Sequence, residues 1–168
     1  MSSSQATIRP AEGADLPAIA DIYAHYVEHT VVTFDLEAPD LAAWERRWGA
    51  AAKAGYPWWV AVLDGECSGY LTAAEFRPKP AYGRTVETTI YLAPEATGRG
   101  LGGALYEVAL PELGRRGFHL ATAGITLPNP ASVALHERHG FTPVGVFEEV
   151  GYKLGGWRDV GWWQRRLD

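Results

Sequence analysis

The chain has 168 residues, of which 47% are hydrophobic and 21% charged, so we expect one globular domain, residues 1–168, with a sizeable core. A net charge of -5 without a run of lysines argues against nucleic acid as a partner. The N-terminus, MSSSQATIRP, lacks the basic and apolar regions of a signal peptide. The longest apolar run, Trp58–Leu63, is too short to cross a membrane, so we expect no membrane partner.

The first third of the chain predicts one strand and two helices. A short strand over Ala6–Arg9 precedes a helix over Asp15–Thr30, because apolar residues recur there at helical spacing and a proline lies near its start. A second helix follows over Asp40–Gly55, where glycine and then proline indicate its end.

The first predicted helix contains a possible metal motif. His25-Tyr26-Val27-Glu28-His29 matches H-x-x-E-H, in which two histidines four residues apart can share a zinc ion. A five-residue match arises easily by chance, and the sequence identifies no third ligand. We therefore expect polar residues on a helix flank and no metal.

A hairpin follows the two helices. The apolar run Trp58–Leu63 predicts a strand at the centre of a sheet, Asp64-Gly65 predicts a tight turn, and Cys67–Glu75 predicts the returning strand. Cys67 is the single cysteine and cannot form an internal disulfide, which favours a reducing cytoplasm. With no histidine near it in sequence, we interpret it as a strand residue and not as a nucleophile.

The loop Phe76–Arg84 combines three cations with an aromatic residue directly before the next strand. Its cations are Arg77, Lys79 and Arg84, and its aromatic residue is Tyr82. Such a loop either binds a carboxylate-bearing substrate or carries solvated charges, and the sequence leaves both open.

The stretch Thr85–Gly103 predicts a phosphate site. A β-rich run, Thr85–Leu92, passes through a turn with four glycines into a helix that begins near Leu101. Unpaired N–H groups at a helix start, beside the positive end of its dipole, form an anion cradle. Glycine lets a phosphate approach the backbone and permits positive φ.

Two common phosphate motifs do not fit this stretch. Gly98, Gly100 and Gly103 satisfy G-x-G-x-x-G, but Pro94-Glu95-Ala96-Thr97 stands between them and the strand, and the next strand, Phe118–Leu127, offers no acid for a ribose. No Lys-Ser/Thr pair follows the glycines, which excludes a P-loop.

The remaining elements complete an alternating pattern. The helix after the glycines is expected to reach about Arg116, with a kink or a break at Pro111. The whole order of strands and helices predicts an α/β protein with a mixed sheet. The later elements are a strand over Phe118–Leu127, a helix over Asn129–His139, and strands within Phe141–Val150 and Tyr152–Arg166 with turns at Gly151, Gly155-Gly156 and Gly161.

Two motifs resemble the GNAT-type N-acetyltransferases. Residues 97–102, TGRGLG, are similar to the R/Q-x-x-G-x-G/A loop that holds the pyrophosphate of acetyl-CoA, with Thr97 at its first position. Asn129–Phe141, NPASVALHERHGF, follows the pattern N-x-x-S/A-x-x-L-Y-x-x-x-G-F, with His136 in the place of tyrosine.

Three further motifs resemble the phosphinothricin and methionine sulfoximine N-acetyltransferase subgroup. They are T-V-E at Thr85–Glu87, L-H-E at Leu135–Glu137, and GYKLGGWRDVGWWQ at Gly151–Gln164. The likeness extends over most of the chain. It implies a GNAT fold, which is a mixed, mostly antiparallel sheet flanked by helices with acetyl-CoA in a splay between the central strands, and it implies a homodimer without metal.

Transfer of an acetyl group to an amine requires a neutral nitrogen, and Glu87 is the candidate general base. Its apolar strand neighbours predict partial desolvation and a raised pKa. The alternative is a solvated residue at a strand end. His136 either stabilises the thioester oxygen, protonates the leaving thiolate, or is a satisfied buried histidine. A backbone N–H of the central strand is a second candidate for the oxygen.

The resemblance also implies the binding residues. For acetyl-CoA they are Ile90, Tyr91, Leu92, Gly98, Arg99, Gly100, Leu101, Gly102, Gly103, Asn129 and Ser132. For the acceptor they are Phe34, Arg77, Tyr82, Arg84, Thr85 and Val86. An arginine paired with an α-carboxylate would select amino-acid-like amines, and Asp35 beside Phe34 favours an acceptor less charged than phosphinothricin.

The sequence therefore predicts an acetyl-CoA-dependent N-acetyltransferase for a small amino-acid-like amine. Two alternatives stay open: another amine, such as a polyamine, an aminoglycoside or a protein N-terminus, and a non-catalytic acyl-CoA-binding module. Tryptophans near the C-terminus serve either a homodimer interface or the core, namely Trp157, Trp162 and Trp163.

Overall fold

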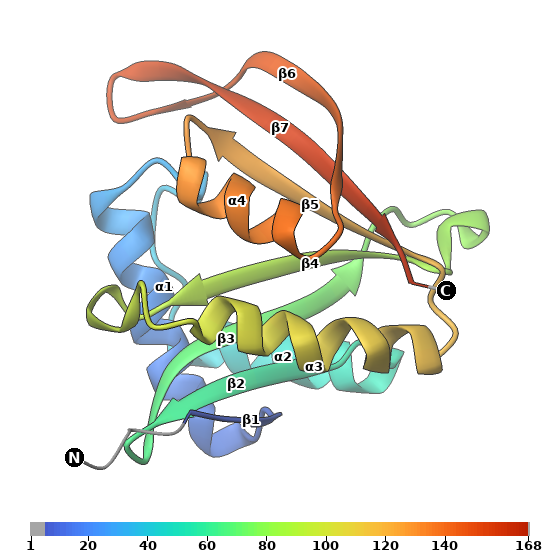
Figure 1. Cartoon of the computed structure of the whole chain (residues 1–168). Helices are drawn as coiled ribbons and strands as arrows, with labels where there is room; N and C mark the ends of the chain where they lie inside the picture. The colour runs from blue at the N-terminus through green and yellow to red at the C-terminus, as the bar shows by residue number, and fades with distance from the viewer. Residues whose placement is uncertain (1–5, 168) are drawn as a thin grey trace.

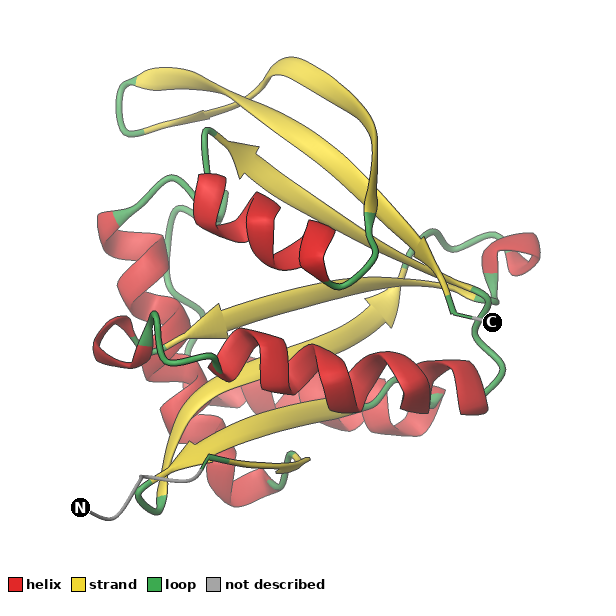
Figure 2. Ribbon diagram, in the orientation of Figure 1, coloured by secondary structure: helices red, strands yellow, loops and turns green. Residues whose placement is uncertain are grey.

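The computed structural model describes residues 6–167, which form one seven-stranded sheet with helices on both faces (Figures 1 and 2). The strands are β1 (Thr7–Pro10), β2 (Trp58–Leu63), β3 (Glu66–Glu75), β4 (Thr85–Leu92), β5 (Leu120–Leu127), β6 (Thr142–Lys153) and β7 (Gly156–Arg166). The helices are α1 (Leu16–His29), α2 (Leu41–Ala54), α3 (Leu101–Arg115) and α4 (Pro130–Arg138). Strands and helices alternate in the predicted order.

The sheet is mixed, as predicted, and mostly antiparallel. Its strand order is β1-β2-β3-β4-β5-β7-β6, and β4–β5 is the parallel pair. The run Trp58–Leu63 forms a strand with the predicted bounds, but β2 lies second from one edge and not at the centre of the sheet. Its apolar character instead reflects burial on both faces, since the consecutive residues Trp59, Val60 and Ala61 all belong to the core.

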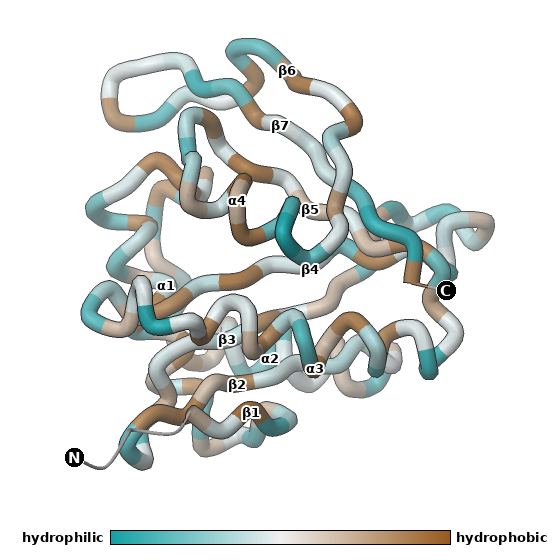
Figure 3. Tube along the Cα trace, in the orientation of Figure 1, coloured by the Kyte–Doolittle hydropathy of each residue, from teal (hydrophilic) through white to brown (hydrophobic). Residues whose placement is uncertain are grey.

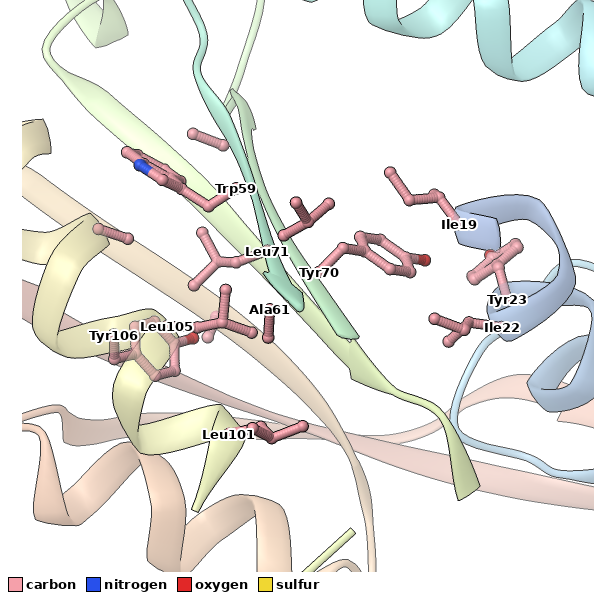
Figure 4. Close-up of a cluster of buried hydrophobic side chains, with 14 of the residues drawn as sticks. Ile19, Ile22, Tyr23, Trp59, Ala61, Tyr70, Leu71, Leu101, Leu105 and Tyr106 are labelled. Carbon is pink, nitrogen blue, oxygen red and sulfur yellow. The ribbon is translucent and has the colours of Figure 1, made fainter. Parts of the chain in front are cut away.

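The core occupies both faces of the sheet (Figure 4). Leu71 of β3 points toward Leu105 and Tyr106 of α3, whereas the neighbouring Tyr70 points toward α1, because successive side chains of a strand alternate between faces. The tube of α3 alternates between hydrophobic and hydrophilic segments, as expected for a helix with one face on the sheet (Figure 3).

The feature that positions the site is the separation of β4 from β5. The two strands pair only over their first three residues, Thr85–Glu87 with Leu120–Thr122. Beyond Glu87 they diverge, as the ribbons show (Figure 1). The second half of β4 therefore pairs with β3 alone and leaves one backbone edge open.

Two predictions about glycine in the fold were wrong. Gly151 and Gly161 lie inside β6 and β7, because they accommodate side chains: a Cβ would stand 2.3 Å from the Phe34 ring at Gly151 and 2.5 Å from the Trp163 ring at Gly161. The chain turns only at the third predicted position, between β6 and β7. Pro111 does not split its helix, since α3 continues through it.

Among residues 6–167, no helix is long and apolar enough to span a membrane.

Candidate active site

A cavity of about 820 Å³ opens where β4 and β5 separate. Its wall comes from the second half of β4, the glycine turn, the first turn of α3, β5, α4 and the segment after α1. The structure brings ten of the eleven predicted cofactor residues to this cleft. They are Ile90, Tyr91, Leu92, Gly98, Gly100, Leu101, Gly102, Gly103, Asn129 and Ser132. Arg99 is exposed on the same turn and is not part of the wall.

The glycine turn fits an anionic group. Gly100 has φ of +80°, a left-handed conformation that favours glycine, and it immediately precedes α3. The first turn of α3 carries no acidic residue. Its free N–H groups thus point into the cleft at the positive end of the helix dipole, as a phosphate requires.

The open edge of β4 fits an extended chain with amide groups. Thr122 Oγ1 donates to the Val86 carbonyl at 3.0 Å, so the peptide groups of Val86 face β5. Along a strand, the N–H and C=O groups of every second residue point to the same side, so the Ile90 N–H also faces the β5 side. Because Ile90 lies beyond the last residue of β4 that pairs with β5, this N–H has no partner on β5. The Leu92 carbonyl already accepts from Tyr26 Oη at 2.5 Å, so it is less available to a ligand.

Asn129 fixes the start of α4 and still faces the cleft. Its Oδ1 accepts from the Ser132 N–H at 3.2 Å, which caps the helix. The amide nitrogen of Asn129 is then available to a ligand carbonyl. This geometry suits the contact with pantetheine that the sequence predicts.

Glu87 is the single carboxylate among the described residues that line the cleft. Thr88 contacts Tyr106 of α3, so strand alternation directs Glu87 to the opposite, α1 face of the sheet. Its carboxylate accepts no hydrogen bond from residues 6–167. Burial raises the pKa of Glu87, and the charge of Arg77 opposes this shift. A partly desolvated carboxylate with free lone pairs can accept a proton from a bound amine.

His136 is buried, at 3% exposure, and both of its ring nitrogens are occupied. Nδ1 is 2.7 Å from the Ser132 carbonyl, which can only accept, so Nδ1 carries the proton. Nε2 must then accept from Tyr106 Oη at 2.8 Å. Tyr106 Oη also lies 3.2 Å from Thr88 Oγ1.

These bonds disfavour both catalytic roles predicted for His136. The ring has no free N–H to donate to a thioester oxygen. Burial also lowers the pKa of His136, which disfavours the protonated ring that a general acid needs. The third sequence interpretation, a satisfied buried histidine, agrees with the hydrogen bonds.

The acceptor candidates divide between three places. Phe34 lines the cleft beside Glu87. Arg77, Tyr82 and Thr85 line a second cavity of about 450 Å³, bounded by β6 and β7. One register pair of β4 and β5 links the walls of the two cavities, because Glu87 lines the first and its partner Thr122 lines the second.

The structure disfavours an acceptor contact by the side chains of the other two candidates. The Val86 side chain has 0% exposure and packs in the core, so it cannot reach an acceptor. Arg84 Nε donates to the Gly117 carbonyl at 2.9 Å, and its side chain lines neither cavity.

Sequence reasoning missed several site residues. Tyr106 holds His136, and Trp162 packs over Gly124 in the wall of the second cavity, 3.2 Å from the position of a Cβ. The helical spacing of Tyr106 signalled only a core residue. Arg138, the last residue of α4, and His139, which follows it, also line the cleft.

The remaining sequence candidates lie outside these cavities. The rings of His25 and His29 on α1 have their centroids 5.2 Å apart and are tilted by 51°, and residues 6–167 contain no group of three potential metal ligands. Cys67 is a half-buried residue of β3, as predicted, and burial raises the pKa of its thiol, which disfavours a reactive thiolate.

Comparison with known proteins identified related sequences and structures. Residues 19–141 match the Acetyltransferase (GNAT) family. A phosphinothricin N-acetyltransferase of Streptomyces coelicolor is 41% identical over 169 residues, with 98% of each chain covered. An L-methionine sulfoximine/L-methionine sulfone acetyltransferase of Pseudomonas paraeruginosa is 37% identical, covering 97% of this chain and 95% of the relative.

A solved structure shares the same fold. The phosphinothricin acetyltransferase of Sinorhizobium meliloti in complex with AcCoA superposes with a TM-score of 0.93. It is 38% identical and the match covers 96% of this chain and 88% of that one.

Proposed function

This chain belongs to the GNAT acetyltransferase family, and from that premise we propose that it acetylates the amino group of a small amino-acid-like acceptor, with Glu87 as the general base. The acceptors we favour are of the methionine sulfoximine, methionine sulfone or phosphinothricin type, which the names of its relatives carry. One observation supports this proposal above the others: Glu87 stands at the point where β4 leaves β5, in the wall of the cleft.

The chain's own groups suit acetyl-CoA along the whole cleft. The N–H groups after Gly100 would hold the pyrophosphate, the open edge of β4 at Ile90 would pair with the pantetheine, and the Asn129 amide would bind a pantetheine carbonyl. Acetyl-CoA supplies the activated acetyl thioester. The Ile90 N–H, on the open edge of the strand, is our candidate for holding the thioester oxygen as charge develops.

Glu87 then acts from the α1 face of the sheet, opposite to the face that packs against α3. Its raised pKa brings the carboxylate closer to the operating pH, so that it can take a proton from the acceptor nitrogen. A positioned general base contributes about 10²–10⁴ in rate.

The second cavity supports an amino acid acceptor with a neutral side chain. Arg77 is the one charged residue among the described residues that line it, and we assign it to the α-carboxylate. Its guanidinium rests 4.5 Å from the Phe76 ring centroid and donates to the Phe76 carbonyl, which orients it. The rest of the wall is mainly apolar, with Tyr82, Phe147 and Trp162 among its residues. This composition favours the sulfoximine and sulfone over the anionic phosphinate of phosphinothricin.

We also propose a homodimer through the β6–β7 hairpin. Strand β6 is an edge strand whose large apolar side chains are exposed, including Val146, Phe147 and Val150 at more than half of their surface. Long apolar edges of this kind pair with another chain. Trp157 is exposed on the same hairpin, whereas Trp163 is buried and belongs to the core. The single, unpaired thiol of Cys67 suits the reducing cytoplasm, where we place the enzyme.

Release of free thiol from acetyl-CoA with a panel of amines tests the proposed activity. We expect methionine sulfoximine and methionine sulfone to give the highest kcat/KM, phosphinothricin less, and polyamines and aminoglycosides no turnover. Faster release with a polyamine than with any amino acid would refute the acceptor class, and release with none of these amines would favour a non-catalytic module.

Sedimentation velocity tests the dimer. We expect a species of twice the 18.3 kDa chain mass, which Val150→Lys dissociates and the matched control Val108→Lys on α3 does not. A wild-type monomer at micromolar concentration would contradict the proposed interface.

A further inference from the structure

The charges that line the cleft are few and unevenly placed. Among its described lining residues, Glu87 is the only acid, and His136, Arg138 and His139 are the only side chains able to carry positive charge. Tyr106 and the Ser132 carbonyl occupy both nitrogens of the buried His136. The positive charge available to a ligand therefore comes from the last residue of α4 and the residue that follows it.

His139 is fixed over the start of α3. Its Nδ1 donates to the Leu135 carbonyl at 2.8 Å, and its ring lies 3.5 Å from the place of a Cβ on Gly103. Arg165 of β7 donates to the His139 carbonyl and ties this end of α4 to the sheet. Nε2 is thus the ring atom left for a ligand, and it donates a hydrogen bond when the ring is protonated.

Arg138 is exposed, and it makes no hydrogen bond or ion pair with any other residue in the range 6–167. Its five N–H donors are free, and a guanidinium matches the geometry of phosphate oxygens. A free arginine at the wall of a cleft differs from a solvated surface charge because it faces the space that a ligand would fill.

The charged side chain of the glycine turn, Arg99, is exposed and does not line the cleft. Thr97 lines the cleft, but its hydroxyl donates to the Pro94 carbonyl at 2.9 Å. Backbone N–H groups alone would then meet a polyanionic ligand in a protein of net charge -5. Compensating charge has to come from elsewhere on the wall of the cleft.

We propose that Arg138 and His139 bind the phosphate groups of coenzyme A from α4, across the cleft from the glycine turn. Together the two walls would hold the phosphates between backbone N–H groups on one side and cationic side chains on the other. The chemistry required is that of a phosphate mono- or diester, which coenzyme A presents as a 3′-phosphate and a pyrophosphate.

Titration calorimetry with three ligands tests this assignment without relying on catalysis. Coenzyme A carries both phosphate groups, dephospho-coenzyme A only the pyrophosphate, and pantetheine neither. The variants are Arg138→Gln and His139→Asn, since asparagine retains a donor near the position of Nδ1 and lacks Nε2. Arg46→Gln is the matched control, because it removes the same charge from an exposed site on α2 that does not line the cleft.

We expect Arg138→Gln to weaken coenzyme A binding by about tenfold and His139→Asn by about threefold, with pantetheine binding unchanged in both. A loss that persists with dephospho-coenzyme A assigns the contact to the pyrophosphate, and a loss that disappears assigns it to the 3′-phosphate. Three results would each overturn the proposal: unchanged coenzyme A affinity in both variants, an equal loss for pantetheine, or an equal loss in Arg46→Gln.

Discussion

Replacing Tyr106 by phenylalanine tests whether His136 has a structural or a catalytic role. Tyr106 has 0% exposure, and its hydroxyl donates to His136 Nε2 and lies near Thr88 Oγ1. Phenylalanine fills nearly the same volume, so the change removes the hydroxyl without opening a large cavity. It leaves the Nε2 acceptor of a buried ring without a donor.

The expected effect is a loss of stability with little loss of turnover. An unsatisfied buried acceptor costs about 1–3 kcal/mol, which corresponds to a fall in Tm of about 2–12 °C at roughly 2–4 °C per kcal/mol for a domain of this size. Because His136 donates nothing to the thioester in our account, kcat measured well below Tm should stay within about threefold of wild type.

Differential scanning calorimetry and steady-state kinetics of the same samples separate the two effects. Tyr56→Phe is the matched control, since the Tyr56 hydroxyl makes no hydrogen bond within residues 6–167 and the residue lines neither cavity. A fall in kcat of about 100-fold at an unchanged Tm would refute the structural assignment and restore a catalytic role for this pair.

Three further substitutions give expectations with a defined direction. Arg77→Gln should shift the acid limb of the kcat/KM profile to higher pH, because the charge of Arg77 lowers the pKa of Glu87; an unchanged limb would show that the two do not interact in solution. Gly151→Ala should raise the acceptor KM and leave coenzyme A affinity unchanged, since its Cβ would displace the Phe34 ring. The same clash should lower stability, and the double variant with Phe34→Ala should recover it. Asp15→Asn should lower the urea-derived free energy of unfolding by about 1–3 kcal/mol at pH 7 and by less at pH 3. Hydrogen bonds from an arginine of β1 lower the pKa of Asp15, so the stabilisation by this carboxylate is present above its unfolded pKa and is lost as pH falls through its folded pKa. An equal difference in unfolding free energy at both pH values would contradict this linkage.

Local sequence signals predicted the bounds of a strand or helix well where neighbouring residues alone determine where it begins and ends. The bounds of Trp58–Leu63 and Thr85–Leu92 are as predicted, because apolar runs with turn residues at both ends are strong local signals. The second predicted helix was also defined locally: Asp40 accepts a hydrogen bond from the Ala43 N–H at 2.8 Å and caps its start.

Local signals were insufficient where the role of a glycine or a polar residue depends on a residue distant in sequence. Gly151 and Gly161 look like turn residues in sequence, but they make room for aromatic rings, one of which lies more than a hundred residues earlier. The hydrogen bonds of His136 depend on Tyr106, a residue of another helix. No single-sequence pattern states that pairing, so the role of the histidine could not be determined before the fold was known.

The same contrast holds for the site. Gly100 and Ile90, for which we propose backbone contacts, both line the cleft; the glycine spacing predicted the first, and the family resemblance implied the second. Acceptor residues were predicted less well, since the side on which a loop arginine lies depends on its contacts. Arg77 faces a cavity, whereas Arg84 bonds to Gly117.

The central claim is that Glu87 removes the proton from the acceptor nitrogen at the point where the two strands part. The most direct measurement is the turnover of Glu87→Gln across pH, together with its affinity for coenzyme A. We predict that kcat falls by about 10²–10⁴ and loses its acid limb, while coenzyme A affinity stays within about twofold. Wild-type turnover with an unchanged pH profile would contradict the claim.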